Sequence, residues 1–275
     1  MKCVLVCTVV LVLAAVSGSA LAFTDDFDSY ATGPLSVVSG GVWNTWGGNS
    51  TDAQVTAQGL SLPNAQYHDG INVPDVVTYW GDLFGGGGGG GGSGAFSFDF
   101  LVHEEGQDDM DTYVFAGSGN PGALDINYGS AIGIFILDWG GSLGSTTLHI
   151  WDTVGANGGG DYGIIELATG LSLDVWYNLE LRASITVADR TANAVTDADG
   201  VFEVWLNGLQ VLGPTSFGLD DPLGWNATEI YSYDAGGETP ERNDYMLFDN
   251  VSAVPEPGLL ALLGLGVIAA LRRRR

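Results

Sequence analysis

The chain has 275 residues, 43 of them glycine, and a net charge of −25 at pH 7 from 33 acidic and 8 basic side chains. Lys2 and the run Arg272 to Arg275 account for five bases, so 8 − 5 = 3 remain between residues 23 and 254. Leaving out Glu256, 33 − 1 = 32 acids face them, a net charge of 3 − 32 = −29. Such a surface repels a phosphate backbone, which excludes nucleic acid as a partner.

The two cysteines, Cys3 and Cys7, lie in the first ten residues, so the rest of the chain has no disulfide and no thiolate metal site. Hydrophobic residues make up 45% and aromatic residues 11%, which is enough for a core and excludes disorder as the default. The roughly 230 residues between the ends fit one large all-β domain or two small ones.

Residues 1–22 predict a secretory signal peptide. Lys2 supplies the positive charge, Val4 to Val16 form an apolar stretch, and Ala20-Leu21-Ala22 is a small-x-small cleavage site. An uncleaved anchor is the alternative, but the apolar stretch is short for a membrane span. We therefore expect the Sec translocon to export the chain and signal peptidase to cut it after Ala22.

The middle of the chain predicts short strands, because apolar and polar residues alternate in runs bounded by Gly, Asn and Asp. The clearest run covers residues 95–102, where Phe96, Phe98 and Phe100 share one face. Further strands are expected at 132–137, 147–151, 179–187, 202–206 before the turn Asn207-Gly208, and 245–251. The pattern predicts an all-β, two-sheet antiparallel sandwich with a core that includes Phe96, Phe98, Phe100, Leu181, Ile185, Phe202 and Val204.

Eight consecutive glycines occupy residues 85–92. A phosphate-binding loop is excluded, because no Lys follows and no strand-to-helix context surrounds the run. We interpret it as a surface loop. It could mark a domain boundary, but 23–84 is short for a sandwich and the strand patterns on both sides are alike, so we expect one domain over 23–253.

This domain resembles the concanavalin A-like, laminin-G-like jelly roll of secreted bacterial proteins. The resemblance rests on four segments: Asp25-Asp26-Phe27-Asp28-Ser29-Tyr30 with Trp43-Asn44-Thr45-Trp46, Trp176 to Leu181, Gly200 to Gly208, and Phe248-Asp249-Asn250-Val251. It implies a jelly-roll fold, but its functions are mixed: glycan binding, adhesion, glycoside hydrolysis and scaffolding all occur, so the fold alone does not fix the function.

Catalytic patterns are weak. The jelly-roll hydrolases carry Glu-x-Asp-x-(x)-Glu on one strand, and this chain has no such run, since Glu166, Glu180 and Glu203 each stand alone. Its histidines, His68, His103 and His149, show neither metal-ligand nor triad spacing. We therefore expect no enzyme.

Calcium is the one cofactor expected. Structural calcium is common at the edge of related sandwiches where the first and last strands meet, which here implies Asp26, Asp28 and Asp249 as ligands. Asp197-Ala198-Asp199-Gly200 has the start of a calcium loop without its continuation, and a hairpin turn is the alternative. The acidic cluster within 104–111 is interpreted as a solvated loop, although calcium there would relieve its like-charge repulsion.

Strand phase selects candidate glycan-binding residues. If Val204 and Leu206 face the core, Trp205 faces outward, and the same reasoning places Trp151 outward. A face bearing both tryptophans with Asp99 and Arg182 would suit a sugar, whose CH face stacks on aromatic rings while polar groups bind its hydroxyls. The alternative is that a loop covers these tryptophans.

At the C-terminus, Pro255-Glu256-Pro257 precede an apolar run from Gly258 to Leu271 and four arginines. As a helix the run is about 21 Å long, short of a hydrocarbon core of about 30 Å. A buried core helix is excluded because adjacent arginines cannot enter a core, whereas they can snorkel and hold a membrane helix with its tail in the cytoplasm. We expect a transmembrane helix over 258–271.

This arrangement resembles the PEP-CTERM sorting signal of Gram-negative bacteria. The resemblance implies that residues 254–275 are a signal, recognised and processed by an exosortase of the inner membrane. The residues that carry the motif are Pro255, Glu256, Pro257, Arg272, Arg273, Arg274 and Arg275. A simple C-terminal membrane anchor is the alternative.

Together these features predict an exported protein that is anchored transiently in the inner membrane and then reaches the cell surface or extracellular matrix of a Gram-negative bacterium. We expect it to bind extracellular polysaccharide without catalysis. The alternatives are a jelly-roll glycoside hydrolase and a structural or adhesion protein with no specific ligand.

Overall fold

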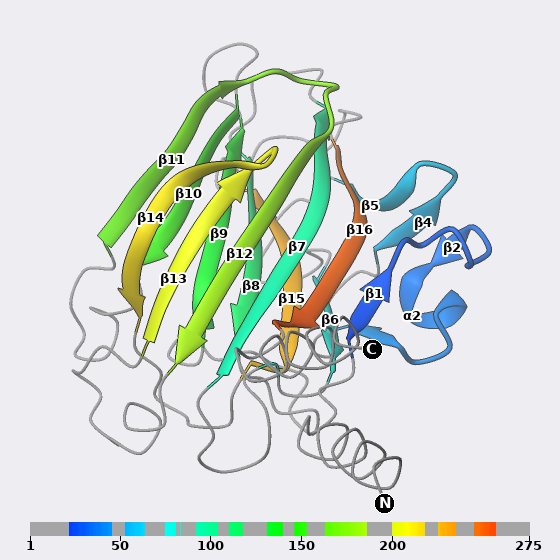
Figure 1. Ribbon diagram of the computed structural model, residues 1–275. Helices are drawn as coiled ribbons and strands as arrows, with labels where there is room; N and C mark the ends of the chain where they lie inside the picture. The colour runs from blue at the N-terminus through cyan, green and yellow to red at the C-terminus, as the bar shows by residue number, and fades with distance from the viewer. Residues whose placement is uncertain are drawn as a thin grey trace, which may run out of the picture.

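The computed structural model describes residues 22–45, 53–63, 75–80, 83, 92–103, 110–117, 131–139, 146–152, 163–185, 200–217, 225–234 and 245–256. Most of these residues lie in strands, which form two sheets in which every paired strand is antiparallel. The predicted all-β, two-sheet antiparallel fold is therefore confirmed (Figure 1).

The expected terminal segments, the signal peptide up to Leu21 and the helix 258–271, lie outside the described residues. Within the ranges given above, no helix has the length and apolar character needed to cross a membrane. The one helix in those ranges is α2 (Leu35–Val38).

The larger sheet has nine strands in the order β14-β13-β12-β7-β16-β5-β4-β2, and β1 pairs with β16. Its strands are β1 (Phe23–Asp25), β2 (Gly33–Pro34), β4 (Gln54–Thr56), β5 (Gly59–Pro63), β7 (Gly92–His103), β12 (Tyr177–Ile185), β13 (Gly200–Leu206), β14 (Leu209–Phe217) and β16 (Tyr245–Pro255).

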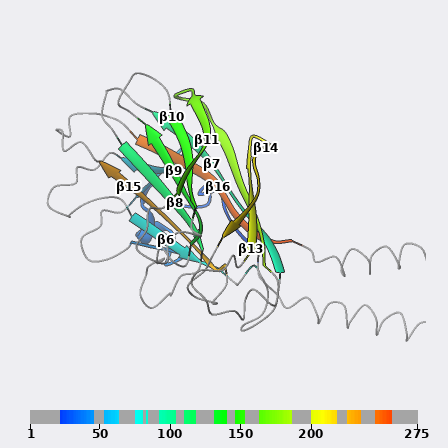
Figure 2. The ribbon, with the colours of Figure 1, turned by 90° about the vertical axis from the view of Figure 1, so that its left-hand side faces the viewer.

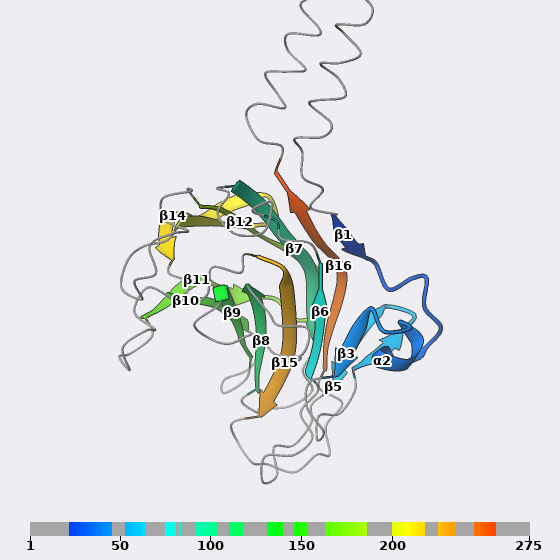
Figure 3. The same ribbon diagram turned by 90° about the horizontal axis from the view of Figure 1, so that it is seen from below.

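The smaller sheet has seven strands in the order β11-β10-β9-β8-β15-β6-β3. They are β3 (Trp43–Thr45), β6 (Asp75–Tyr79), β8 (Met110–Gly117), β9 (Ala131–Trp139), β10 (Thr146–Asp152), β11 (Gly163–Leu171) and β15 (Ala227–Asp234). The two sheets lie face to face (Figure 2), and the nine-stranded sheet bends over the other when seen from below (Figure 3). Each sheet therefore has one face toward the core and one outer face.

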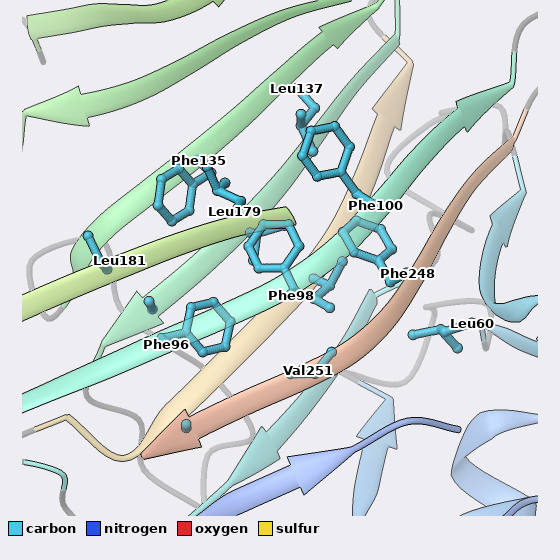
Figure 4. Packing of buried hydrophobic residues seen from close by; sticks show 14 of the residues in the cluster. Leu60, Phe96, Phe98, Phe100, Phe135, Leu137, Leu179, Leu181, Phe248 and Val251 are labelled. Atoms are coloured by element: carbon cyan, nitrogen blue, oxygen red, sulfur yellow. The ribbon is translucent and has the colours of Figure 1, made fainter. Parts of the chain in front are cut away.

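The core is organised around β7, the strand between β12 and β16. Phe96, Phe98 and Phe100 are completely buried, as their alternation with polar residues predicted. The ring of Phe98 lies 6.0 Å from that of Phe135 on the opposite sheet and 5.7 Å from that of Phe248 on β16 (Figure 4). All seven expected core residues are buried: Phe96, Phe98, Phe100, Leu181, Ile185, Phe202 and Val204.

The expected strand boundaries differ most from the structure in β7 and β16. β7 begins at Gly92, so the last residue of the glycine run is in a strand, paired with Ile185. β16 continues past the expected end at Val251 to Pro255, because the alternation persists: Val251 and Ala253 are buried while Ser252 and Val254 are half-buried. The expected hairpin turn is present, with positive φ at Asn207 (49°) and Gly208 (75°).

Glycine is required at one close approach between strands. Gly59 has φ 121°, and a Cβ atom there would lie 2.5 Å from the carbonyl oxygen of Phe248. β5 can therefore pair with β16 only because this position lacks a side chain.

The first strand is fixed by a buried carboxylate, Asp25, which is 8% exposed. It accepts hydrogen bonds from the Phe27 backbone N–H (2.9 Å), the Tyr30 hydroxyl (2.7 Å) and the Trp43 Nε1–H (2.8 Å). Charge-assisted hydrogen bonds of this kind are stronger than neutral ones. Asp25 thus ties β1 to the aromatic residues that cover this end of the core.

Replacing Phe98 by Ala should lower the free energy of unfolding by about 3–5 kcal/mol, because the cavity would open between both sheets. Urea unfolding of the chain measures this. Leu209→Ala is the matched control, since Leu209 is 73% exposed, and its effect should stay within about 0.5 kcal/mol. Equal losses in the two variants would contradict the assigned core.

The Tyr30 hydroxyl should make stability fall at alkaline pH. Burial, and then the hydrogen bond to Asp25, raise the pKa of Tyr30 well above its usual value of 10.0. Below about pH 10 the Tyr30 hydroxyl is neutral in the folded and the unfolded chain, and its contribution to stability is complete. Above it the unfolded tyrosine ionises first, so the contribution is lost as pH rises toward the folded pKa.

We expect Tyr30→Phe to remove this contribution, which is measured as the difference in unfolding free energy between wild type and variant. The difference should be on the order of 1 kcal/mol near neutral pH and should shrink between about pH 10 and about pH 12. A difference independent of pH would show that the hydroxyl is not held by Asp25.

Candidate functional site

The four candidate glycan-binding residues do not share a face. Asp99, Arg182 and Trp205 lie on β7, β12 and β13 of the nine-stranded sheet, whereas Trp151 lies on β10 of the seven-stranded sheet. The prediction of one face bearing all four is therefore wrong. Strand phase gives the outward direction of a side chain, but it carries no information about which sheet the strand joins.

Trp205 and Arg182 form a compact pair. The Arg182 guanidinium carbon lies 4.7 Å from the centroid of the Trp205 ring, and its Nε donates to Glu180 Oε1 at 2.7 Å. That hydrogen bond is the main cause that raises the pKa of Arg182. One face of the Trp205 ring is therefore already occupied by a cation, which leaves less of it for a sugar.

Asp99 has a structural task on β7. Its Oδ1 accepts from Asn178 Nδ2 (2.7 Å), and its Oδ2 accepts from Asn250 Nδ2 (2.8 Å). Asn250 has φ 50° and lies where the register between β16 and β7 shifts between Asp249 and Ser252. Asp99 thus joins β12 to a bulge in β16, a role that the sequence analysis did not identify.

The expected calcium ligands lie in an acidic region. Asp249 faces Asp99 across the strand pair, and its pKa is raised by burial first and further by the charges of Asp28, Asp99 and Asp26. Their oxygens suit a hard cation. However, in the part of the chain that the structure describes, no group of three or more His, Cys, Asp or Glu side chains is arranged to hold a metal ion. Calcium at Asp26, Asp28 and Asp249 stays a prediction.

Beside these carboxylates the nine-stranded sheet is hollowed. The hollow has a volume of about 430 Å³, and its lining includes Asp28, Asp249, Trp176 and Tyr245. Trp176 is 41% exposed, and the Tyr245 ring stacks on His103 at 4.6 Å. The outer face of the nine-stranded sheet therefore has an exposed aromatic side chain, Trp176, beside the hollow.

The outer face of the seven-stranded sheet carries an aromatic cluster. Tyr79, Tyr113 and Tyr231 are half-buried there around Phe115, which is 2% exposed. The Tyr113 and Tyr231 rings are parallel within 7°, with centroids 4.7 Å apart. Their strand neighbours Val114 and Ile230 belong to the core between the sheets, so the tyrosines point the other way. The sequence does not mark this cluster, because apolar and aromatic side chains occupy both faces of β8 at residues 113–116.

One row of cross-strand partners crosses this face from β6 to β11. In order, the paired residues are Asp75, Tyr231, Tyr113, Ile136, His149 and Glu166. We call it the cross-sheet row. Six adjacent strands span about 24 Å at the usual spacing. Asp75 is 5% exposed and Glu166 is exposed, so the row is covered at its β6 end and open at its β11 end.

Two polar side chains on this face are partly or fully buried. His149 Nε2 is inaccessible to solvent and, in the part of the chain that is described, has no hydrogen-bond partner. Glu229, two positions from Tyr231 on β15, is 6% exposed. A buried nitrogen without a partner costs free energy, so His149 is a costly residue to place here.

Comparison with known proteins identifies the C-terminal segment. Residues 253–275 match the PEP-CTERM protein-sorting motif, which includes Pro255, Glu256, Pro257 and the four terminal arginines. The predicted sorting signal is confirmed, and it implies export with membrane-associated sorting in Gram-negative bacteria. No curated protein sequence matches the chain.

Several solved structures share the fold. An alginate lyase, Aly36B, determined as a mutant with alginate trisaccharide, has a TM-score of 0.54 and 16% identity over 86% of this chain and 98% of its own. An endo-1,3-β-glucanase from Streptomyces sioyaensis has a TM-score of 0.52 and 12% identity over 86% and 97%. A structure described with endo-acting O-glycanases of human gut microbiota has a TM-score of 0.51 and 11% identity over 85% and 98%.

At these identities the likeness establishes the fold and nothing finer. The predicted concanavalin A-like jelly roll is confirmed, because carbohydrate-active enzymes with that fold align over nearly their whole length. The chain is thus a jelly-roll protein that carries a PEP-CTERM sorting motif at its C-terminus.

Proposed function

We propose that this exported protein binds polysaccharide, without cleaving it, at the cell surface or in the extracellular matrix. The observation that supports this is the cross-sheet row, with the stacked rings of Tyr113 and Tyr231 at its centre. An outer sheet face is usually polar and solvated. This one instead presents half-buried tyrosines between a carboxylate and an imidazole.

Such a row has the chemistry of a sugar-binding surface. Tyrosine rings offer apolar faces to the CH groups of a sugar, while their hydroxyls remain available to its polar groups. Glu166, at the open end, adds two oxygens that can bind sugar hydroxyls. A glycan lying across the strands would contact each of these in turn.

Charge selects the class of glycan. Arg182 is the one Lys or Arg among the described residues, and it lies on the other sheet. The cross-sheet row holds Asp75 and Glu166, and Glu229 lies beside it. Like charges repel in a surface of this kind, so a polyuronate such as alginate is disfavoured and a neutral glycan is favoured.

Sorting places this binding surface outside the cell. Export through the Sec translocon, cleavage by signal peptidase and processing by an exosortase would release an acidic domain whose solubility is favoured by its charge. That route would pass through a transient inner-membrane intermediate and end at the cell surface or in the extracellular matrix.

Binding to laminarin, a neutral β-glucan, tests the surface. We expect Tyr113→Ala and Tyr231→Ala to weaken binding about tenfold each, or about 1.4 kcal/mol, because each removes a ring on which a sugar would stack. Isothermal titration of the purified chain, with calcium and again with chelator, gives the affinity. Alginate should bind more weakly than laminarin, and the gap should narrow at high salt.

Trp176→Ala is the matched control, since it removes an exposed ring from the hollow on the other sheet. The Trp176→Ala variant should bind laminarin with the same affinity as the wild type. If Trp176→Ala loses binding while the tyrosine variants keep it, the ligand lies on the nine-stranded sheet. If neutral and charged glycans all fail to bind, the chain is a structural or adhesion protein.

Glycoside hydrolysis is a second candidate, favoured by one observation. Asp75 and Glu229 lie on adjacent strands of the same face and are diagonal partners, since Tyr231 pairs with Asp75 and Glu229 pairs with Val77. Diagonal positions are about 7–8 Å apart, with the Cβ atoms somewhat closer, and inverting enzymes hold their carboxyl groups about 6.5–9.5 Å apart. Both side chains are less than a tenth exposed, which is why we favour binding.

Product analysis separates the two. We expect no new reducing ends from laminarin with the wild-type chain, and no unsaturated ends from alginate. The variants Glu229→Gln and Asp75→Asn give the baseline, once their melting temperatures show that each of them folds. Reducing ends that appear with the wild type and disappear with Glu229→Gln would replace the binding proposal by hydrolysis.

A further inference from the structure

The sorting motif begins inside the sandwich. The matched segment starts at Ala253, and β16 continues to Pro255, which pairs with Gly94 on β7. Pro255 has no N–H of its own, but the Glu256 N–H donates to the Ser93 carbonyl at 2.9 Å. The first two residues of the Pro-Glu-Pro are therefore held in the folded domain.

The strand is held on both sides at this point. Phe23 on β1 pairs with Ala253, opposite the pairing of Ala253 with Phe96 on β7. Ala253 and Val251 are completely buried. β16 is thus an interior strand of the sheet as far as Ala253, and Phe23 beside it is the residue that follows the expected signal peptidase site.

The Glu256 side chain also has surroundings on the domain. It helps to line a hollow of about 270 Å³ together with Ser93, Arg182 and Glu203. Its charge is one of those that raise the pKa of Arg182, after the hydrogen bond that Arg182 donates to Glu180. Glu256 therefore lies over β7, β12 and β13, and it is not simply the start of a linker.

We infer that the exosortase cut falls on the C-terminal side of Glu256, so that the mature protein keeps Pro255 and Glu256 as the end of β16. A processing enzyme must bring the scissile bond itself into its active site. Backbone that is paired with Ser93 and Gly94 can enter such a site only after local unfolding of β16, which costs free energy. A cut on the C-terminal side of Glu256 leaves these pairings in place.

The reaction breaks one peptide C–N bond after Glu256. Water supplies the hydroxyl that makes the new carboxylate on the domain, and the nitrogen of the departing tail takes the proton. If another nucleophile takes the place of water, the acyl group passes to it, but the bond that breaks is the same. The position of the cut can therefore be determined from the C-terminal peptide in either case.

Mass spectrometry of the protein released by its native host tests this directly. The last peptide should end at Glu256 or at a later residue, with or without an attached group. An end at Pro255 or earlier would overturn the inference, and so would a released protein with its full tail.

Two controls separate the position of the cut from its cause. The variant with Pro255→Ala, Glu256→Ala and Pro257→Ala should remain full-length in the inner membrane; release with the wild-type terminus would mean that an unrelated protease makes the cut. Hydrogen exchange of the full chain in detergent should show the Glu256 amide at least about tenfold slower than in an unfolded peptide. Unprotected exchange there would remove the physical basis of the inference.

Discussion

The antiparallel pairing of β7 with β16 is the constraint on which the rest of the structure depends. It brings Phe98 and Phe248 together in the core at 5.7 Å, places Asp99 opposite Asp249 on the outer face, and carries the last strand to Ser93. A single pair of strands thus positions the core, the acidic region and the sorting motif. Because β7 and β16 are about 150 positions apart in the sequence, this pairing closes the sandwich only when nearly the whole domain has been made.

Sequence patterns predicted the individual strands correctly, but they did not predict which strands share a sheet. The stripe of Phe96, Phe98 and Phe100 was enough to predict a buried strand, because alternation has one cause in a sheet. The grouping of Trp151 with Trp205 failed, because a strand has the same alternation in either sheet. The cross-sheet row was missed for a related reason: Asp75, Tyr113, Tyr231 and His149 are distant in sequence, and only the register of five strand pairs aligns them.

The same limit applies to polar residues. Asp99 was selected as a free carboxylate on an outward position, yet both of its oxygens accept amide hydrogens from Asn178 and Asn250. Asp25 appeared only as part of a family motif, and it proves to hold Trp43 and Tyr30 in place. A carboxylate in a sequence does not indicate whether it binds a ligand or the protein itself, because that depends on donors contributed by other strands.

The charge of the domain connects its two proposed properties. A net charge of −25, with the bases concentrated at the ends of the chain, leaves the exported domain strongly acidic. That charge favours solubility and disfavours anionic polysaccharides. Four of the eight basic residues of the chain are the C-terminal arginines, so removal of the tail leaves the domain more acidic. If β16 keeps Glu256, processing removes those cations while the sheet retains every pairing it has, so the fold of the released domain is already complete before the tail departs.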